Sequence, residues 1–155
     1  MNLIEIPFVK EVGIQKAADG KLGLPFTERV FNHLRTIHAS AQFALAETAS
    51  GEILQVLFPD LVGKVVPVLR DSQIKFKNPA TKSIIAYPAV DEENVAKFKE
   101  QFSKKGRASI SVTVEIKDME NNVTSTGTFN WFVQGIDVKI PNKNHKLESL
   151  NAPKL

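Results

Sequence analysis

The longest apolar segment of the chain covers residues 39–57. Its apolar side chains point in every direction around a helix rather than along one stripe, it contains no proline, and its first glycine is Gly51. A helix that is hydrophobic on all sides is a buried helix. At about 1.5 Å per residue it would extend roughly 28 Å, the width of a small domain. The pattern therefore predicts a central helix that the rest of the fold encloses.

After this helix the period of the pattern changes to two. The apolar positions of the next run share one parity, and polar or charged residues occupy the other, which predicts a strand with one solvated face. The apolar positions are Val66, Val68, Ile74 and Phe76. A turn at 78–81 and a second apolar run at 83–87 predict that this strand returns as a hairpin.

Two further alternating runs, 109–117 and 123–134, flank Asn121 and Asn122 and predict a second, longer hairpin. Between the two hairpins, residues 91–105 begin with acids and end with lysines, which suits the helix dipole, and Gly106 follows as a C-cap. The apolar residues of this helix form one narrow stripe, so we expect it to lie on the surface.

The N-terminal part of the chain is less regular. Residues 2–16 predict a short helix or irregular arm, residues 17–20 a turn, and residues 21–27 a strand that Pro25 confines to an edge or ends early. Together the elements predict an α+β domain in which a curved antiparallel sheet wraps one long helix.

Composition supports one folded domain. The chain has 155 residues, of which 43% are hydrophobic and 24% charged, the balance of an ordinary globular protein. We expect a single domain at 1–135, including the N-terminal arm, and a polar tail at 136–155. There is no cysteine, which excludes thiolate catalysis and cysteine zinc sites, and three scattered histidines suggest no metal site.

The net charge of +3 comes from the tail, because residues 1–138 carry 16 basic and 16 acidic side chains. A nucleic-acid-binding protein would carry its basic residues across the folded body, so we expect no nucleic-acid partner. No apolar run is long enough to span a membrane, and the N-terminus lacks the pattern of a signal peptide. We therefore expect a cytoplasmic protein with no membrane partner.

Glu47 is the only charged residue between Ala39 and Gly51, in the middle of the apolar helix. Burying an unpaired carboxylate costs several kcal/mol or raises its pKa. Two structural explanations are open: the helix turns Glu47 into solvent, or a lysine pairs with it. The functional explanation is a general base or nucleophile. The helix also begins directly after His38, and its first backbone N–H groups could hold an oxyanion. His38 itself could be an N-cap or a buried histidine.

The segment from Asn32 to Glu47 resembles the hotdog-fold acyl-CoA thioesterases, in particular the phenylacetate-degradation and 4-hydroxybenzoyl-CoA branch. That branch has an Asn or Gln, a His-Gly-Gly six residues later, and an acid nine residues after the His in a Leu-Ala-acid context. Asn32, His38 and Glu47 keep these spacings. The segment 103–107, ahead of an alternating strand, resembles the Gly-Arg segment of the same family.

The resemblance implies the hotdog fold and hydrolysis of an acyl thioester to a carboxylate and free CoA. Glu47 would be the general base or nucleophile, the backbone N–H of Ala39 would lie in the oxyanion hole, Asn32 would orient the thioester carbonyl, and His38 would support the same loop. The implied contacts for the CoA phosphates are Lys104, Lys105 and Arg107. No separate cofactor is implied, and the partners would be acyl-CoA and a second copy of the chain, in a homodimer or a dimer of dimers.

The sequence also departs from the family pattern. His-Gly-Gly is replaced by His38-Ala39-Ser40, the position one turn after the acid is Gly51 instead of a hydroxyl residue, and the helix at 91–105 is longer than usual. These departures leave two alternatives to the enzyme: a non-catalytic acyl-CoA or lipid-binding hotdog dimer, and a purely structural oligomer. The acyl group is not determined by the sequence.

Overall fold

A computed structural model describes residues 2–136 of the chain. The fold contains one six-stranded antiparallel sheet, and its strand order is β1-β2-β4-β5-β6-β3. The strands are β1 (Gln15–Lys16), β2 (Leu22–Leu24), β3 (Val65–Phe76), β4 (Ile84–Ala89), β5 (Arg107–Asp118) and β6 (Val123–Gly135). The helices are α1 (Pro7–Val12), α2 (Ala39–Leu57), α3 (Glu92–Lys105) and the short 3-10 turns η1 (Leu3–Glu5), η2 (Glu28–Val30) and η3 (Pro59–Leu61).

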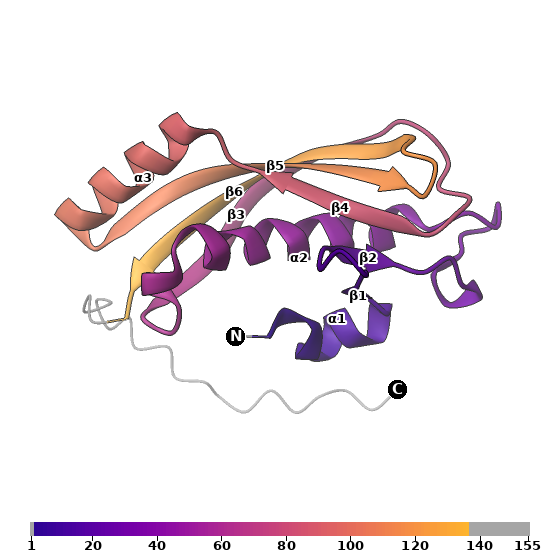
Figure 1. Ribbon diagram of the computed structural model, residues 1–155, viewed down its shortest axis with the longest axis horizontal. Coiled ribbons are helices and arrows are strands. Elements are labelled where there is room, and N and C mark those ends of the chain that lie inside the picture. The colour runs from indigo at the N-terminus through magenta and orange to yellow at the C-terminus, as the bar shows by residue number, and fades with distance from the viewer. Residues whose placement is uncertain (1, 137–155) are drawn as a thin grey trace, which may run out of the picture.

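The curved sheet lies over α2, and the N-terminal arm with α1 packs on the opposite side of that helix (Figure 1). This arrangement explains why α2 is apolar all round, because it is covered from both sides. Leu45 and Ala46 are fully buried, as are Val112 of β5 and Phe129 of β6. The predicted α+β architecture, a long central helix wrapped by an antiparallel sheet, is confirmed, and α2 has the predicted bounds.

The predicted surface helix is also confirmed as α3. The side chain of Asp91 caps its start by accepting a hydrogen bond from the backbone N–H of Asn94 at 2.7 Å. Gly106 ends it with a left-handed φ of 64°, which a residue without a Cβ adopts at little cost. Phe98 is the one buried side chain of this helix and contacts Phe58 at the end of α2. No helix among residues 2–136 is long and apolar enough to cross a membrane.

The predicted hairpin of the first alternating run with residues 83–87 is wrong. β3 pairs with β6 at one edge of the sheet, whereas β4 pairs with β2 and β5. The connection between β3 and β4 is not a tight turn, because it is held against the loop before α2. The backbone N–H of Ile37 in that loop donates to the carbonyl oxygen of Ala80, which is fully buried. The segment passes the tip of the β5–β6 hairpin, where the backbone N–H of Lys77 donates to the carbonyl oxygen of Thr124, and reaches the far side of β5.

The predicted parity of β3 is wrong as well, because a β-bulge interrupts its pairing with β6 between Leu69 and Asp71. An extra residue on one strand shifts every later side chain to the opposite face. Val66 and Val68 precede the bulge and lie on the outer face, where they are 50% and 45% exposed, while Ile74 follows it and faces inward. The edge strand thus presents two exposed valines.

The long β5–β6 hairpin is as predicted, and one glycine within it has a packing role. A Cβ built on Gly127 would come within 2.9 Å of Cε2 of Phe129 and 3.2 Å of the carbonyl oxygen of Gln73. We expect Gly127→Ala to destabilise the fold by about 1–3 kcal/mol, the usual cost of overpacking a core. Urea unfolding would measure the loss. A double-mutant cycle with Phe129→Leu tests this origin, because leucine lacks the ring atoms that would clash. The loss of stability in the double variant should therefore be smaller than the sum of the losses in the two single variants. If the two losses of stability were strictly additive, the clash with Phe129 would not be the cause.

Candidate active site

Glu47 lies on the middle of α2 and is half-buried. Neither structural explanation for this residue holds within residues 2–136: the helix does not turn it fully into solvent, and no described cation lies within ion-pair distance of its carboxylate. Burial raises the pKa of the Glu47 carboxyl above its ordinary value, because the charged form loses hydration without gaining a partner. An acid held in this state is typical of functional sites.

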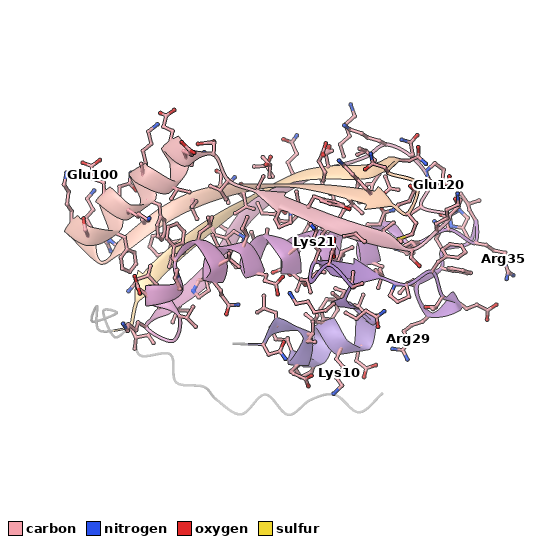
Figure 2. All side chains as sticks on the ribbon, in the orientation of Figure 1. Lys10, Lys21, Arg29, Arg35, Glu100 and Glu120 are labelled. Atoms are coloured by element: carbon pink, nitrogen blue, oxygen red, sulfur yellow. The ribbon has the colours of Figure 1, made fainter. Side chains whose placement is uncertain are left out.

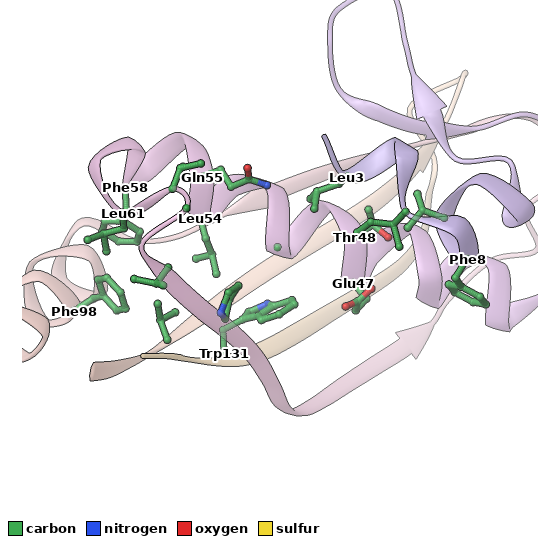
Figure 3. Close-up of a pocket in the computed structure, with 18 residues that line it drawn as sticks. Leu3, Phe8, Glu47, Thr48, Leu54, Gln55, Phe58, Leu61, Phe98 and Trp131 are labelled. Atoms are coloured by element: carbon green, nitrogen blue, oxygen red, sulfur yellow. The ribbon is translucent and has the colours of Figure 1, made fainter. Parts of the chain in front are cut away.

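Glu47 lies toward one end of a cavity of about 520 Å³, with Phe8 of α1 beyond it (Figure 3). The cavity runs along α2 between the helix, the β3–β6 edge of the sheet and the N-terminal arm. Leu3, Ile6, Phe8 and Val9 of the arm form one wall. The other lining residues are Thr48, Gly51, Leu54, Gln55, Phe58, Leu61, Val62, Gly63, Val65, Pro67, Phe98, Trp131 and Val133. The cavity is thus an apolar channel with a carboxylate toward one end.

Trp131 forms the middle of the sheet-side wall, and its orientation is fixed. Its indole Nε1 donates to Ser50 Oγ at 3.0 Å, and Ser50 Oγ donates in turn to the backbone carbonyl of Glu47 at 2.7 Å. A Cβ on Gly51 would come within 3.3 Å of the indole ring, so the glycine lets the ring lie against the helix. Sequence reasoning did not assign Trp131 to the site. The lack of a side chain at Gly51, one turn after Glu47, was the signal that could have found it.

The start of α2 offers a free backbone donor. His38 is the N-cap, and its Nδ1 accepts a hydrogen bond from the backbone N–H of Ser40 at 3.0 Å. Among the described residues, the backbone N–H of Ala39 has no hydrogen-bond acceptor, and Ala39 is exposed. Since the start of a helix also carries a partial positive charge, this group could stabilise an oxyanion that is presented to it.

Asn32 holds the loop that leads to this helix start. Its Oδ1 accepts from the backbone N–H groups of Leu34 and Thr36 at 2.9 and 3.1 Å, and its Nδ2 donates to Thr36 Oγ1 at 2.9 Å. This network lets Arg35 adopt a left-handed φ of 58°. Asn32 is therefore a loop-ordering residue in the single chain, close to the helix start rather than to the cavity.

One chain does not bring the two proposed catalytic groups together. Ala39 and Glu47 are eight residues apart on a continuous helix, which separates them by about 12 Å along its axis. The scissile carbonyl of one substrate cannot touch both groups over that distance. One chain therefore does not form a site that uses both groups.

The three candidate cations for the CoA phosphates gather around the C-terminal end of α3. Lys104 forms an ion pair with Glu100 at 2.6 Å, and Glu100 points away from the sheet (Figure 2). Lys105 and Arg107 are exposed next to it. Because Phe98 of the same helix lines the cavity end opposite Glu47, the structure does not bring these cations together with Glu47 in one chain.

The sequence profile of one family, described as a domain of unknown function (DUF4442), matches residues 6–133. The chain belongs to the DUF4442 family. A search of curated proteins gives no match for this DUF4442 protein.

Solved structures similar to this DUF4442 protein define its fold. PA5026 from Pseudomonas aeruginosa, described as a probable thioesterase, has a TM-score of 0.74 at 21% identity, covering 86% of this chain and 91% of that one. The thioesterase HI1161 from Haemophilus influenzae has a TM-score of 0.64 at 17% identity, covering 92% and 90%. BH2602 from Bacillus halodurans, solved with CoA, has a TM-score of 0.61 at 22% identity, covering 79% and 72%. The DUF4442 protein thus has the predicted hotdog fold.

The raised pKa of Glu47 predicts a pH-dependent stability of this DUF4442 protein. A carboxyl whose pKa is higher in the folded than in the unfolded state stabilises the fold below its unfolded pKa, and this contribution is lost as the pH rises through the folded pKa. At pH 7, above the ordinary pKa of a glutamate, the raised pKa of Glu47 therefore lowers the stability of the fold. We expect Glu47→Gln to unfold at a higher Tm than the natural protein at pH 7, with the difference shrinking toward pH 4. Thermal unfolding followed by circular dichroism measures the Tm of both proteins at each pH. A lower Tm of Glu47→Gln than of the natural protein at pH 7 would contradict a raised pKa of Glu47.

Proposed function

We propose that this DUF4442 protein hydrolyses an acyl-CoA thioester to a carboxylate and free CoA, with Glu47 as general base or nucleophile. The observation that carries the proposal is an unpaired, half-buried carboxylate toward one end of an apolar cavity large enough for an acyl group. Similarity to thioesterase structures, and to one solved with CoA, supports it at the level of the fold.

Two routes use the same residues. In the first, the Glu47 carboxylate takes a proton from a water whose oxygen attacks the thioester carbon, and the proton then passes to the departing CoA thiolate. In the second, the carboxylate attacks the carbon directly, CoA leaves as a thiolate, and water hydrolyses the resulting mixed anhydride. In both routes the carbonyl oxygen becomes an oxyanion, and the proposed donor to it is the backbone N–H of Ala39. His38 holds this helix start in place and Asn32 orders the loop before it.

We further propose that two copies of the chain form the site, each supplying Glu47 to one site and the Ala39 N–H to the other. The distance between these groups on one helix supports this arrangement, and so does the sheet edge. β3 is a long edge strand with unpaired backbone groups and two exposed valines, which suits pairing with the same strand of a second copy. Two such dimers could associate further into a dimer of dimers.

Lys104, Lys105 and Arg107 stay proposed contacts for the CoA phosphates. Their place at the cavity end opposite Glu47 means that the CoA arm has to pass outside the cavity to reach them, or that a second copy presents them. The long, hydrophilic CoA arm would then follow the protein surface.

The experiment is thiol release from a panel of acyl-CoA esters, followed with a thiol-reactive dye. The protein contributes no background because it has no cysteine. Turnover of some esters is the expected result. A non-catalytic acyl-CoA-binding protein is the second candidate, favoured by the absence of any described cation or hydrogen-bond donor that would keep Glu47 ionised. Saturable binding without thiol release would establish that second function and overturn the first.

A further inference from the structure

The cavity has a defined length and direction. Glu47, Gly51, Leu54 and Phe58 lie on one face of α2, at the spacing of successive helical turns. From Glu47 to Phe58 the helix advances about 16 Å. At the far end Phe98 of α3 lies against Phe58 with ring centroids 4.3 Å apart, and both rings are buried. The cavity is therefore elongated, with two aromatic rings at one end and the carboxylate toward the other, where Phe8 of α1 lies beyond it (Figure 3).

The far end carries no polar side chain. It is lined by Phe58, Leu61, Val62, Val65, Phe98 and Val133. A hydroxyl or carboxylate on the distal end of a ligand would lose its hydration there without gaining a side-chain partner, at a substantial cost. Near Glu47, the hydroxyl of Thr48 already donates to the carbonyl oxygen of Ala44 at 2.7 Å. Gln55 adds an amide side chain to the lining near Leu54, between the two ends (Figure 3). The far end thus selects against acyl groups with a distal hydroxyl or carboxylate and against the hydrophilic arm of CoA itself.

The middle of the cavity is rigid. The Trp131 ring is packed against Gly51 on one side and held by Ser50 through its indole nitrogen, so it cannot easily turn aside for a branch or a bulky ring. Because Trp131 lines the cavity, a ligand that extends along it has to pass this fixed ring, which favours a slender group. From this geometry we propose that the cavity binds the tail of an unbranched aliphatic acyl chain of medium to long length, with the thioester at Glu47 and the terminal methyl at Phe98 and Val65. The inference rests on the proposed function for the position of the thioester, and it names the substrate class of that site.

The test separates binding from hydrolysis. Trp131 is the only tryptophan of the chain and lines the cavity, so its fluorescence reports occupancy directly. The probes are S-alkyl-CoA thioethers of increasing chain length, which cannot be hydrolysed, and a 4-hydroxyphenacyl-CoA thioether as the aromatic comparison. Burying one methylene contributes enough free energy to lower Kd by about three- to fourfold. We expect Kd to fall by this factor per carbon and then to level off when the chain reaches the far end.

Val65→Phe fills the far end and should move this plateau to shorter chains. Val56→Phe is the matched control, since Val56 of α2 is 72% exposed and does not line the cavity, so this change should leave the plateau unchanged. Chain-length-dependent binding without hydrolysis of any ester would support the inference while the proposed function fails. A Kd that does not vary with chain length in the natural protein, or tighter binding of the aromatic thioether than of every alkyl one, would overturn the inference even if thioesters are hydrolysed.

Discussion

Glu47→Gln is expected to lower kcat/KM for acyl-CoA hydrolysis by at least about a hundredfold, the contribution of a well-placed general base. Glutamine has nearly the same size and shape as glutamate, so the cavity and α2 are preserved. It can neither accept a proton from water at neutral pH nor attack the thioester carbon. Thiol release from the best ester of the panel measures the loss.

Glu52→Gln is the matched control for this variant. Glu52 lies five residues further along α2, forms an ion pair with Lys16 and does not line the cavity. Its replacement removes a carboxylate of the same helix and should leave the rate within about twofold, because exposed ion pairs contribute little. If the Glu47→Gln variant kept most of the activity, the proposed mechanism would be wrong, although the assignment of the fold would not change.

Ala39→Pro should remove the proposed oxyanion donor without unfolding the helix, with an expected loss of about 10²–10³-fold in kcat. Proline has no backbone N–H, and it is favoured at the first position of a helix. The preceding residue, His38, has φ −60° and ψ 142°, a conformation that proline permits in its predecessor. Ala39→Ser keeps the N–H and should keep the activity.

Dimers that combine a Glu47→Gln chain with an Ala39→Pro chain distinguish a site shared between two copies from a site within one chain. If Glu47 and the Ala39 N–H of each site come from different copies, a dimer of one Glu47→Gln chain and one Ala39→Pro chain contains one intact site. Random assembly after coexpression makes half of the dimers mixed, so about a quarter of the natural activity should return. Activity that stays at the level of the separate variants would show that both groups act within one chain, or that one of them is not used.

The sequence predicted those elements that are determined locally. The apolar surface of α2 and the capping residues Asp91 and Gly106 of α3 specify helices without reference to the rest of the fold. Strand partners are different, because alternation marks a strand but carries no information about its neighbour. The β3–β4 hairpin was therefore predicted from proximity in sequence, whereas β3 pairs with β6, the last strand along the chain. The bulge at Leu69 and Asp71 has no clear signal in the pattern either, and it inverted the faces expected for Val66 and Val68.

The candidate site divides in the same way. Glu47 could be found from sequence because a lone charge in an apolar helix conflicts with its surroundings. The helix start at His38 and Ala39 follows from the bounds of α2. The cavity could not be found, since its walls come from the arm, α2, β3, α3 and β6, and only the folded chain brings them together. Trp131 belongs to the site through a hydrogen bond to Ser50, 81 positions earlier, and the missing side chain at Gly51 is the one local sign of this contact.

The place of β3 at the edge of the sheet also governs the order in which the protein can form during synthesis. A ribosome releases α2 and β3 well before it makes β6, the only strand among the described residues that pairs with β3. The apolar helix therefore leaves the ribosome with no sheet to cover it, and the nascent chain carries that exposed surface until the last strand is complete. Pairing between such distant segments is slow and leaves intermediates prone to aggregation. The yield of folded protein should thus depend on chaperones that shield α2 and on the time taken to translate the β5–β6 hairpin.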